Sequence, residues 1–383
     1  MSQELKAEVV VVGAGIHGSS AALHLARAGK DTILLEKFPV PHARGSSHGQ
    51  SRITRKANYA HPALTPIHGD SLNMWQSLQA QAGVTLFKPH SMLVIGTKEQ
   101  KSLIDKIAST VKHLGETPQW ADPKDINTKY RINFPDSSLA FMDPSAGILK
   151  ADKCVMALQQ LFRDAGGRLM DEWMVEDVVS VDEGVEVRGS LGVVRAGSVV
   201  LCPGPWAGPF LAKIGVHIPL KVERITVLYM KMLDPTTPTT IFIDFTETPH
   251  VYCVPQLEYP GMVKLAYHQG PVVDPDKRDI AVSDELRESI KKYMSKKYPG
   301  LCPEPAIEET CLYTVTPDGE FVLDRHPKHP NIVFACGFSG TGFKIAPAIG
   351  EELCRLVLGQ PPKYNLQHFK ADRFNNTLSS SKL

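Results

Sequence analysis

The pattern of hydrophobic positions is most regular near the N-terminus. Val9–Val12 is a continuous β-branched run, which is typical of a strand buried on both faces of a parallel sheet. An alanine- and leucine-rich stretch over 19–28 predicts a helix that ends at Gly29, and Thr32–Leu35 predicts a second strand. This order of strand, helix and strand predicts a parallel α/β unit.

Further along the chain, helical spacing of apolar residues alternates with strand-like runs. Helices are expected over 72–82, 100–114, 153–165, 283–298 and 346–358. Strands are expected over 173–187, 192–201, 219–232, 251–267, 306–316 and 332–336. After a turn at 317–320, residues 321–323 are expected to form the return strand of a hairpin.

Composition and charge narrow the classes of function. The net charge is +1, so nothing in the charge balance indicates a nucleic acid or a membrane surface as a partner. We find no uncharged apolar run as long as a bilayer span, and no basic, cleavable signal peptide at the start. The seven cysteines are widely spaced without a CxxC pair, which argues against a disulfide framework and a cysteine-rich metal site.

The last three residues carry a possible targeting signal. Ser381-Lys382-Leu383 follows a polar tail. A C-terminal tripeptide of this kind is read as an address by the peroxisomal import receptor. We therefore expect the peroxisome as the location and this receptor as a partner.

A glycine-rich turn joins the first strand to the first helix. Gly13, Gly15 and Gly18 match G-x-G-x-x-G, which allows a tight turn, close approach to a pyrophosphate and close packing of helix on strand. Glu36 closes the second strand, where a carboxylate accepts hydrogen bonds from ribose hydroxyls and repels a 2′-phosphate. The pattern predicts a dinucleotide site and disfavours NADP, but it leaves FAD and NAD open.

Two further segments could carry chemistry. The loop over 45–55 joins small residues to Arg52 and Arg55, which suits a loop that crosses a planar ring while an arginine reaches an anion. On a strand, Lys264 and His268 share one face, as in a cavity wall. A solvated basic loop and a solvent-facing edge strand have the same patterns, so both alternatives remain.

Near the C-terminus, a thiol and a second glycine loop precede the final helix. Cys311 is a lone cysteine, and burial is the ordinary fate of such a residue. The loop over 337–342 precedes Lys344 and a helix, where backbone N–H groups and the helix dipole favour negative charge. Such charge develops on a reduced flavin.

Taken in order, these segments resemble one family: the monomeric sarcosine oxidases, and within it the branch of peroxisomal sarcosine oxidases and L-pipecolate oxidases. The motifs span nearly the whole chain. They are Val10-Val11-Val12-Gly13-Ala14-Gly15, the 45–55 loop, the strand from Lys264 to His268, Cys311-Leu312-Tyr313-Thr314 with Thr316-Pro317-Asp318, and Gly337-Phe338-Ser339-Gly340 with Gly342-Phe343-Lys344.

The resemblance implies an FAD bonded through its 8α-methyl group to Cys311. It further implies that Arg55 and Lys344 hold the substrate carboxylate, and that Lys264 stands by flavin N5 and assists the reaction with O2. Catalytic roles would fall to Lys264, His268, Tyr252 and Arg52, with Tyr252 also contacting substrate. The residues implied to bind the cofactor are Gly13, Gly15, Gly18, Glu36, Ser51, Arg52, Cys311, Gly340, Gly342 and Lys344.

The chain departs from the family pattern at two positions. Thr341 stands where a histidine is common in the last glycine loop. Asn58 stands where an aromatic residue is frequent, with Tyr59 one position later. Both changes bear on the choice among sarcosine, L-pipecolate and L-proline.

The expected fold is therefore α/β, with α+β character over two domains of the glutathione-reductase and D-amino-acid-oxidase kind. A Rossmann-like FAD-binding domain would comprise 1–85, 145–215 and 318–383. An inserted substrate domain with a mixed or antiparallel sheet would comprise 86–144 and 216–317. The expected function is oxidation of a secondary amino acid by a monomer, with hydride transfer to FAD and reduction of O2 to H2O2. The alternatives are a fructosyl-amino-acid oxidase, an NAD-dependent dehydrogenase and a non-catalytic flavin-binding protein.

Overall fold

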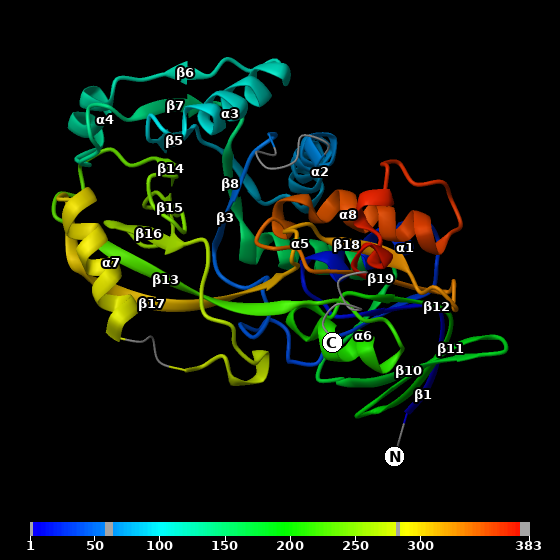
Figure 1. The fold of residues 1–383 in the computed structure, drawn as a ribbon. Coiled ribbons are helices and arrows are strands. Elements are labelled where there is room, and N and C mark those ends of the chain that lie inside the picture. Colours follow the sequence, from blue (N-terminus) through cyan, green and yellow to red (C-terminus); the bar gives the residue numbers. More distant parts are fainter. Residues whose placement is uncertain (1–2, 58–63, 281–283, 376–383) are drawn as a thin grey trace.

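A computed structural model describes residues 3–57, 64–280 and 284–375 of the chain. Within these residues, two eight-stranded sheets and one three-stranded sheet form the frame (Figure 1). The α/β fold class expected from the sequence is confirmed. Asn58, Tyr59 and the tripeptide Ser381-Lys382-Leu383 lie outside the described residues.

The first large sheet has the order β10-β11-β12-β1-β2-β9, and β19 links β18 to the end of β12. Strands β9, β2, β1, β12 and β19 are parallel to one another. The strands of this sheet are β1 (Gln3–Val12), β2 (Thr32–Leu35), β9 (Arg168–Met170), β10 (Val175–Val181), β11 (Gly184–Gly189), β12 (Gly192–Leu201), β18 (Val322–Arg325) and β19 (Ile332–Cys336).

Helices enclose this sheet on both faces. Val9 and Val11 point to the face that packs against the helices α1 (Ile16–Arg27), α2 (Thr65–Ala82), α5 (Ala151–Asp164) and α8 (Gly342–Val357). Val10 and Val12 point to the opposite face, which packs against Trp173 and α6 (Ala207–Lys213). Burial on both faces explains the unbroken valine run.

The second large sheet has the order β17-β13-β16-β15-β14-β5-β7-β6 and is antiparallel except between β14 and β5. Its strands are β5 (Met92–Gly96), β6 (Gln119–Trp120), β7 (Leu139–Asp143), β13 (Lys221–Met232), β14 (Ile241–Asp244), β15 (Val251–Val254), β16 (Met262–Tyr267) and β17 (Leu301–Val315). The ribbon of β13 and β17 runs from α7 toward the first sheet (Figure 1).

Two helices cover one face of the second sheet, and a third covers part of the other. α4 (Pro123–Tyr130) and α7 (Asp284–Lys297) pack on the face that carries Val263 and Leu265. α3 (Lys101–His113) packs on part of the opposite face. Ala266 and Cys311 belong to the remainder of that face. The small sheet of β3 (Ser51–Thr54), β8 (Gly147–Lys150) and β4 (Phe87–Pro89) lies between the two large sheets (Figure 1).

The structure corrects three expectations about strands. The stretch 173–187 is not one strand, because β10 turns into β11 at Gly184, whose φ of 127° suits glycine. The stretch 251–267 is likewise two strands, separated by a loop over 255–261. The expected return strand is wrong: β18 pairs with β19 in the first sheet, while β17 belongs to the second. In addition, α8 begins at Gly342, earlier than expected, which places Lys344 in its first turn.

Candidate active site

Two cavities lie between the large sheets. The larger has a volume of about 520 Å³ and is lined by the Gly13–Gly15 turn and Glu36. The smaller has a volume of about 340 Å³ and is lined by Lys264 and Lys344 among others. Both volumes are in the range of small-molecule sites. The two cavities adjoin, because they share the lining residues His48, Gly49, Arg52, Cys311, Tyr313 and Gly340.

The glycine turn is shaped by close backbone contacts. Gly13 has a φ of 96°, and a Cβ atom there would lie 2.4 Å from the Cys202 carbonyl oxygen. A Cβ at Gly18 would lie 1.9 Å from the Gly13 carbonyl oxygen. Gly18 therefore does not line the cavity; it allows α1 to pack under the turn. The N-terminus of α1 has no acidic residue in its first turn and opens into the larger cavity, which fits the pyrophosphate of a dinucleotide.

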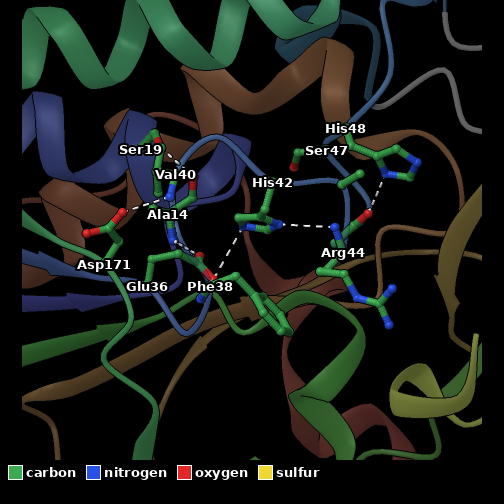
Figure 2. A network of polar contacts seen from close by, with 12 residues as sticks. Ala14, Ser19, Glu36, Phe38, Val40, His42, Arg44, Ser47, His48 and Asp171 are labelled. Atoms are coloured by element: carbon green, nitrogen blue, oxygen red, sulfur yellow. Dashed lines mark hydrogen bonds and ion pairs between the residues drawn. The ribbon is translucent and has the colours of Figure 1, made fainter. Parts of the chain in front are cut away.

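Glu36 organises the polar end of the larger cavity (Figure 2). Its Oε2 accepts the Ala14 backbone N–H at 2.8 Å, and its Oε1 lies 3.4 Å from Nε2 of His42. His42 Nδ1 accepts the Arg44 backbone N–H at 3.1 Å, so in the neutral ring the proton is on Nε2, facing Glu36. Ser47 Oγ accepts the Ile16 N–H at 3.0 Å, at the start of α1. The sequence reasoning missed Ser47, although it lies in the 45–55 loop that was singled out, and His42, which lies just before that loop.

Arg52 and Cys311 meet where the two cavities join. Arg52 lies on β3, and its Nη2 donates to the carbonyls of Ser46 at 3.0 Å and His48 at 2.6 Å. The same Nη2 lies 3.7 Å from the Sγ of Cys311 on β17. The 45–55 loop therefore folds around its own arginine, and the thiol faces the cavity rather than a closed core.

Arg278 fixes the residues just before this loop to the second sheet. Its side chain is 4 % exposed. Its Nη1 donates to the carbonyls of Ala43 at 2.9 Å and Arg44 at 2.7 Å, and its Nη2 donates to the carbonyl of Thr310, the residue before Cys311. Nothing in the sequence pattern around Arg278 indicated this role, because its partners are backbone carbonyls of distant segments.

Arg55 and Lys344 form a pair among the four cationic side chains that line the smaller cavity, the others being Arg52 and Lys264. Lys344 lies in the first turn of α8 and is buried, and Arg55 lies just after β3 with its Nε donating to the Ala57 carbonyl at 3.1 Å. Burial, and then the charge of Arg55, hold the pKa of the Lys344 ammonium well below its usual range. The fold thus brings together two cationic side chains that are far apart in the chain, and a bound anion would relieve their repulsion.

Aromatic rings form another wall of the smaller cavity. His268 stacks on His250 with a centroid distance of 4.5 Å, and the Tyr313 hydroxyl lies 3.5 Å from His268 Nδ1. Burial first, and then His250, lower the pKa of His268 to about 3, so this ring is neutral at neutral pH. Burial first, and then Cys311, raise the pKa of Tyr252 to about 12, so its hydroxyl keeps its proton. His250 and Tyr313 are wall residues that the sequence reasoning missed.

Lys264 projects from β16 into the same cavity. Its Nζ lies 3.1 Å from Glu258 Oε1 and 3.3 Å from Ser51 Oγ, and its side chain is 6 % exposed. The expected division of faces on this strand is present, because Val263 and Leu265 pack in the core under α7 while Ala266 packs beside Cys311. Glu258 was missed, since a glutamate in a turn is ordinarily a solvated residue.

Most of the sequence-predicted site residues come together. Those that line the larger cavity are Gly13, Gly15, Glu36, Arg52, Cys311, Gly340 and Gly342. Those that line the smaller cavity are Ser51, Arg52, Arg55, Tyr252, Lys264, His268, Cys311, Gly340, Thr341 and Lys344.

Two searches of the described residues add nothing to this site. No cluster of three or more histidine, cysteine, aspartate or glutamate side chains in 3–57, 64–280 and 284–375 is arranged to hold a metal ion. In the same residues, the search for helices long and apolar enough to cross a membrane finds none.

Comparison with known families gives a match over most of the chain. The model of the family described as "FAD dependent oxidoreductase" matches residues 8–356. The peroxisomal sarcosine oxidase of Mus musculus is 38 % identical to this chain, and the alignment covers 98 % of both. The monomeric sarcosine oxidase of Bacillus sp. (strain B-0618) is 30 % identical, with 96 % of both covered.

Comparison with solved structures agrees on the fold. The amino acid oxidase NikD has a TM-score of 0.86 and 21 % identity, with 96 % of this chain and 97 % of that chain covered. L-proline dehydrogenase from P. horikoshii has a TM-score of 0.84 and 21 % identity, with 98 % and 99 % covered. At this identity, the likeness establishes the shared architecture.

Proposed function

The chain belongs to the family of FAD-dependent oxidoreductases, and from this premise we propose that it oxidises a small secondary amino acid with O2 as the electron acceptor. When bound, FAD accepts a hydride equivalent from the carbon next to the amine nitrogen and passes two electrons to O2. The imine then hydrolyses, and H2O2 is the second product. The NAD-dependent alternative is not supported by the family match.

The observation that carries this proposal is the pair of cations beside the cavity junction, of which Lys344 is buried and Arg55 is partly buried. Arg55 and Lys344 line the smaller cavity, and the shared residues Arg52 and Cys311 place that cavity next to the larger one. A carboxylate bound between the two cations would hold its own α-carbon at the junction. Arginine offers a planar fork to a carboxylate, and lysine adds a mobile point charge.

The electrostatics of the cavity also select the form of the substrate. With two cations present and His268 neutral, the cavity disfavours a further positive charge. An amino acid therefore binds as a carboxylate with a neutral amine, which is the form that can give up a hydride. The protein's contribution is then orientation and charge compensation, with little need for acid–base catalysis in this step.

The remaining residues act around the junction. Tyr252 and His268 line the wall that faces the substrate, and Arg52 lies on the other side of the junction beside the Cys311 sulfur. Lys264, held by Ser51 and Glu258, supplies positive charge for the reduction of O2. Stopped-flow traces of Lys264→Met should show slower re-oxidation with nearly unchanged reduction, whereas equal losses in both would assign Lys264 to substrate binding.

We further propose that FAD is bonded to Cys311. The thiol lines both cavities and is 8 % exposed, and the positive charge of Arg52 lies 3.7 Å away. After acid precipitation, the yellow colour should stay with the protein pellet and map to a peptide that contains Cys311. Colour found entirely in the supernatant of flavin-replete enzyme contradicts the linkage.

Oxygen consumption across a panel of amines tests the function itself. Sarcosine, L-pipecolate, L-proline and fructosyl-glycine should be compared at one concentration. The proposal expects consumption with at least one of the first three and equal production of H2O2. Activity restricted to fructosyl-glycine would favour the sugar-modified amino acids as substrates, and no consumption with any member would overturn the proposal.

We propose the peroxisome as the location, through Ser381-Lys382-Leu383. The support is this tripeptide together with the names of the mouse and human relatives, which are peroxisomal sarcosine oxidases. A fluorescent fusion with the intact C-terminus should be punctate, and one without the tripeptide should be cytosolic. Punctate signal from both would point to another address.

A further inference from the structure

A line of hydrogen-bonding groups connects Lys264 to Glu309, which also lines the smaller cavity. Lys264 Nζ contacts Glu258 Oε1 at 3.1 Å, and both side chains are buried, with 6 % and 5 % exposed. The other carboxylate oxygen of Glu258 accepts from the hydroxyl of Tyr229, the residue directly opposite Lys264 in the pairing of β13 with β16. That hydroxyl also lies 3.1 Å from Oε2 of Glu309, which is only partly buried.

The phenol of Tyr229 connects the two carboxylates in this line. Its oxygen contacts Oε2 of Glu258 on one side and Oε2 of Glu309 on the other. A phenol carries one hydrogen, and its oxygen can accept another as it donates its own. Tyr229 is therefore placed to pass a proton from one carboxyl group to the other.

Reduction of O2 by the proposed enzyme consumes one proton from outside the flavin. Conversion of O2 to H2O2 takes up two electrons and two protons, of which a bound, reduced FAD would supply both electrons and one proton. The second proton must reach the oxygen at the junction. An ammonium that gives up a proton there needs a donor behind it to restore its charge for the next turnover.

We propose that Glu258 and Tyr229 form a proton path that recharges Lys264 from Glu309 during the reaction with O2, an inference that rests on the proposed oxidase function. Lys264 gives one N–H proton to the reduced oxygen, and Glu258 passes a proton to the resulting amine. Tyr229 donates its hydroxyl proton to Glu258 and takes one from Glu309, and Glu309 takes one from water. Glu258 and Tyr229 are thus positioning residues that act through Lys264.

The charges around Lys264 favour this direction. Burial lowers the pKa of Lys264, and the charge of Glu258 opposes that lowering; Arg52 lowers the pKa further, and Glu309 raises it. The burial of Tyr229, and next the carboxylate of Glu258, raise the pKa of its phenol, so Tyr229 relays a proton without remaining ionised. The ring of Tyr229 also lies under the ammonium, with Nζ 5.6 Å from its centroid.

The test uses the flavin-loaded enzyme, photoreduced without any substrate and mixed with O2 in a stopped-flow instrument. The variants are Glu258→Gln, Tyr229→Phe and Glu309→Gln. Tyr259→Phe is the matched control, because its ring packs on Tyr229 at 4.8 Å but its hydroxyl partner is Gln50. We expect Glu258→Gln and Tyr229→Phe to slow re-oxidation at least about tenfold, the low end for a positioned acid or base, and Tyr259→Phe to match wild type.

A spectroscopic measurement separates the path from simple placement of the lysine. The visible absorption of the oxidised flavin, titrated with pH, reports the charge of Lys264 without turnover. Glu258→Gln should move this titration to lower pH, because it removes the carboxylate that raises the pKa of Lys264, whereas Tyr229→Phe should leave it nearly in place.

Three outcomes are decisive. Slow re-oxidation in Tyr229→Phe with an unchanged flavin titration supports the proton path. Re-oxidation at the wild-type rate in both Tyr229→Phe and Glu309→Gln overturns it, and Glu258 then only holds Lys264. A photoreduced wild-type enzyme that reacts with O2 no faster than free reduced flavin overturns the proposed oxidase function and the path with it.

Discussion

The larger cavity and the smaller cavity obtain their polar groups in different ways. The polar end of the larger cavity is built from residues close in sequence, such as the Gly13–Gly15 turn and Glu36, and many of its contacts are backbone N–H groups. The smaller cavity gathers charged side chains from β3, β16 and α8. In the proposed function, the larger cavity would recognise its ligand mainly through backbone shape and the smaller cavity mainly through charged side chains.

Because of this difference, we expect the two cavities to respond differently to substitutions and to pH. In the larger cavity, an added atom meets backbone that cannot move aside, so steric changes should dominate. The smaller cavity is lined by several charged side chains, so there loss of a cation and changes of pH should dominate. The predictions below run from the largest expected effect to the smallest.

The substitution expected to disturb the larger cavity most is Gly18→Ala. A Cβ at Gly18 would lie 1.9 Å from the Gly13 carbonyl oxygen, so the turn and α1 must separate. We expect a loss of about 1–3 kcal/mol in unfolding free energy and a marked loss of bound flavin. Thermal unfolding and the ratio of flavin to protein measure both.

The matched control for that change is Gly69→Ala in α2. Both glycines are helical, but a Cβ at Gly69 meets no atom of the described residues within 4 Å. This variant should keep its flavin and be slightly more stable, by about 0.5–1 kcal/mol, because alanine favours the helix. Equal behaviour of the two variants would show that close packing at Gly18 is unimportant.

In the smaller cavity, the largest effect should come from Lys344→Ala. Removing one of the two cations should weaken binding of the carboxylate inhibitor methylthioacetate by at least about tenfold, or 1.4 kcal/mol. Arg55→Ala should behave likewise, and the double variant should lose less than the sum because both residues contact one group. Flavin content should stay at the wild-type level in each. Inhibitor affinity within about twofold of wild type in both single variants would remove this pair from substrate binding.

Inhibitor affinity should also depend on pH through Lys344. Burial and Arg55 hold the pKa of Lys344 well below its usual range in the ligand-free site, and a bound carboxylate favours the charged ammonium. Binding therefore takes up a proton once the pH exceeds that lowered pKa. Affinity should be full below this pKa and fall as the pH rises through it, with a limit of about tenfold per pH unit. Lys344→Met should lose this dependence, whereas a slope unchanged in Lys344→Met would assign the titration to another group.

The smallest effect should follow Ser47→Ala. This change removes the side-chain oxygen that accepts the Ile16 N–H at 3.0 Å, while the backbone of the turn stays in place. One hydrogen bond of this kind contributes about 0.5–1.5 kcal/mol, and the binding free energy of flavin should fall by no more than that. Flavin release in a denaturant titration gives the comparison with Gly18→Ala. A larger loss of flavin binding in Ser47→Ala than in Gly18→Ala would show that a single hydrogen bond matters more in this cavity than the close packing of the backbone.

The sequence was informative where neighbours in the chain are also neighbours in space. The β1–α1–β2 unit was predicted because its strands, turn and helix adjoin one another and each has its own local signal. The prediction of one strand over 173–187 was wrong because valines alternate in the same phase before and after Asp182-Glu183-Gly184, so this short polar interruption was not taken as the turn that it is. Similarly, Val322–Arg325 has the pattern of a hairpin strand, but its partner β19 is set by the packing of the first sheet.

The candidate site shows the same limit. The resemblance to a known family pointed to Arg55, Lys264 and Lys344, whose types are unusual inside a cavity. It gave no sign of Glu258 or Tyr229, because the contact between them depends on which residue of β13 faces Lys264 across the sheet. Register is a property of the assembled sheet, and it cannot be read from either strand alone.

The hydrogen bonds that Arg278 donates to the carbonyls of Ala43 and Arg44 have a consequence for folding during synthesis. The loop at Ala43 and Arg44 is synthesised early, yet the guanidinium that holds its carbonyls follows 235 and 234 residues later. At ribosomal speeds of roughly 5–20 residues per second, that interval is on the order of 10–50 s. A nascent chain can fold its first βαβ unit during this time. The loop at Ala43 and Arg44 cannot take its final position until Arg278 has been synthesised. Stable uptake of the cofactor is therefore an event of late folding, after most of the chain has left the ribosome.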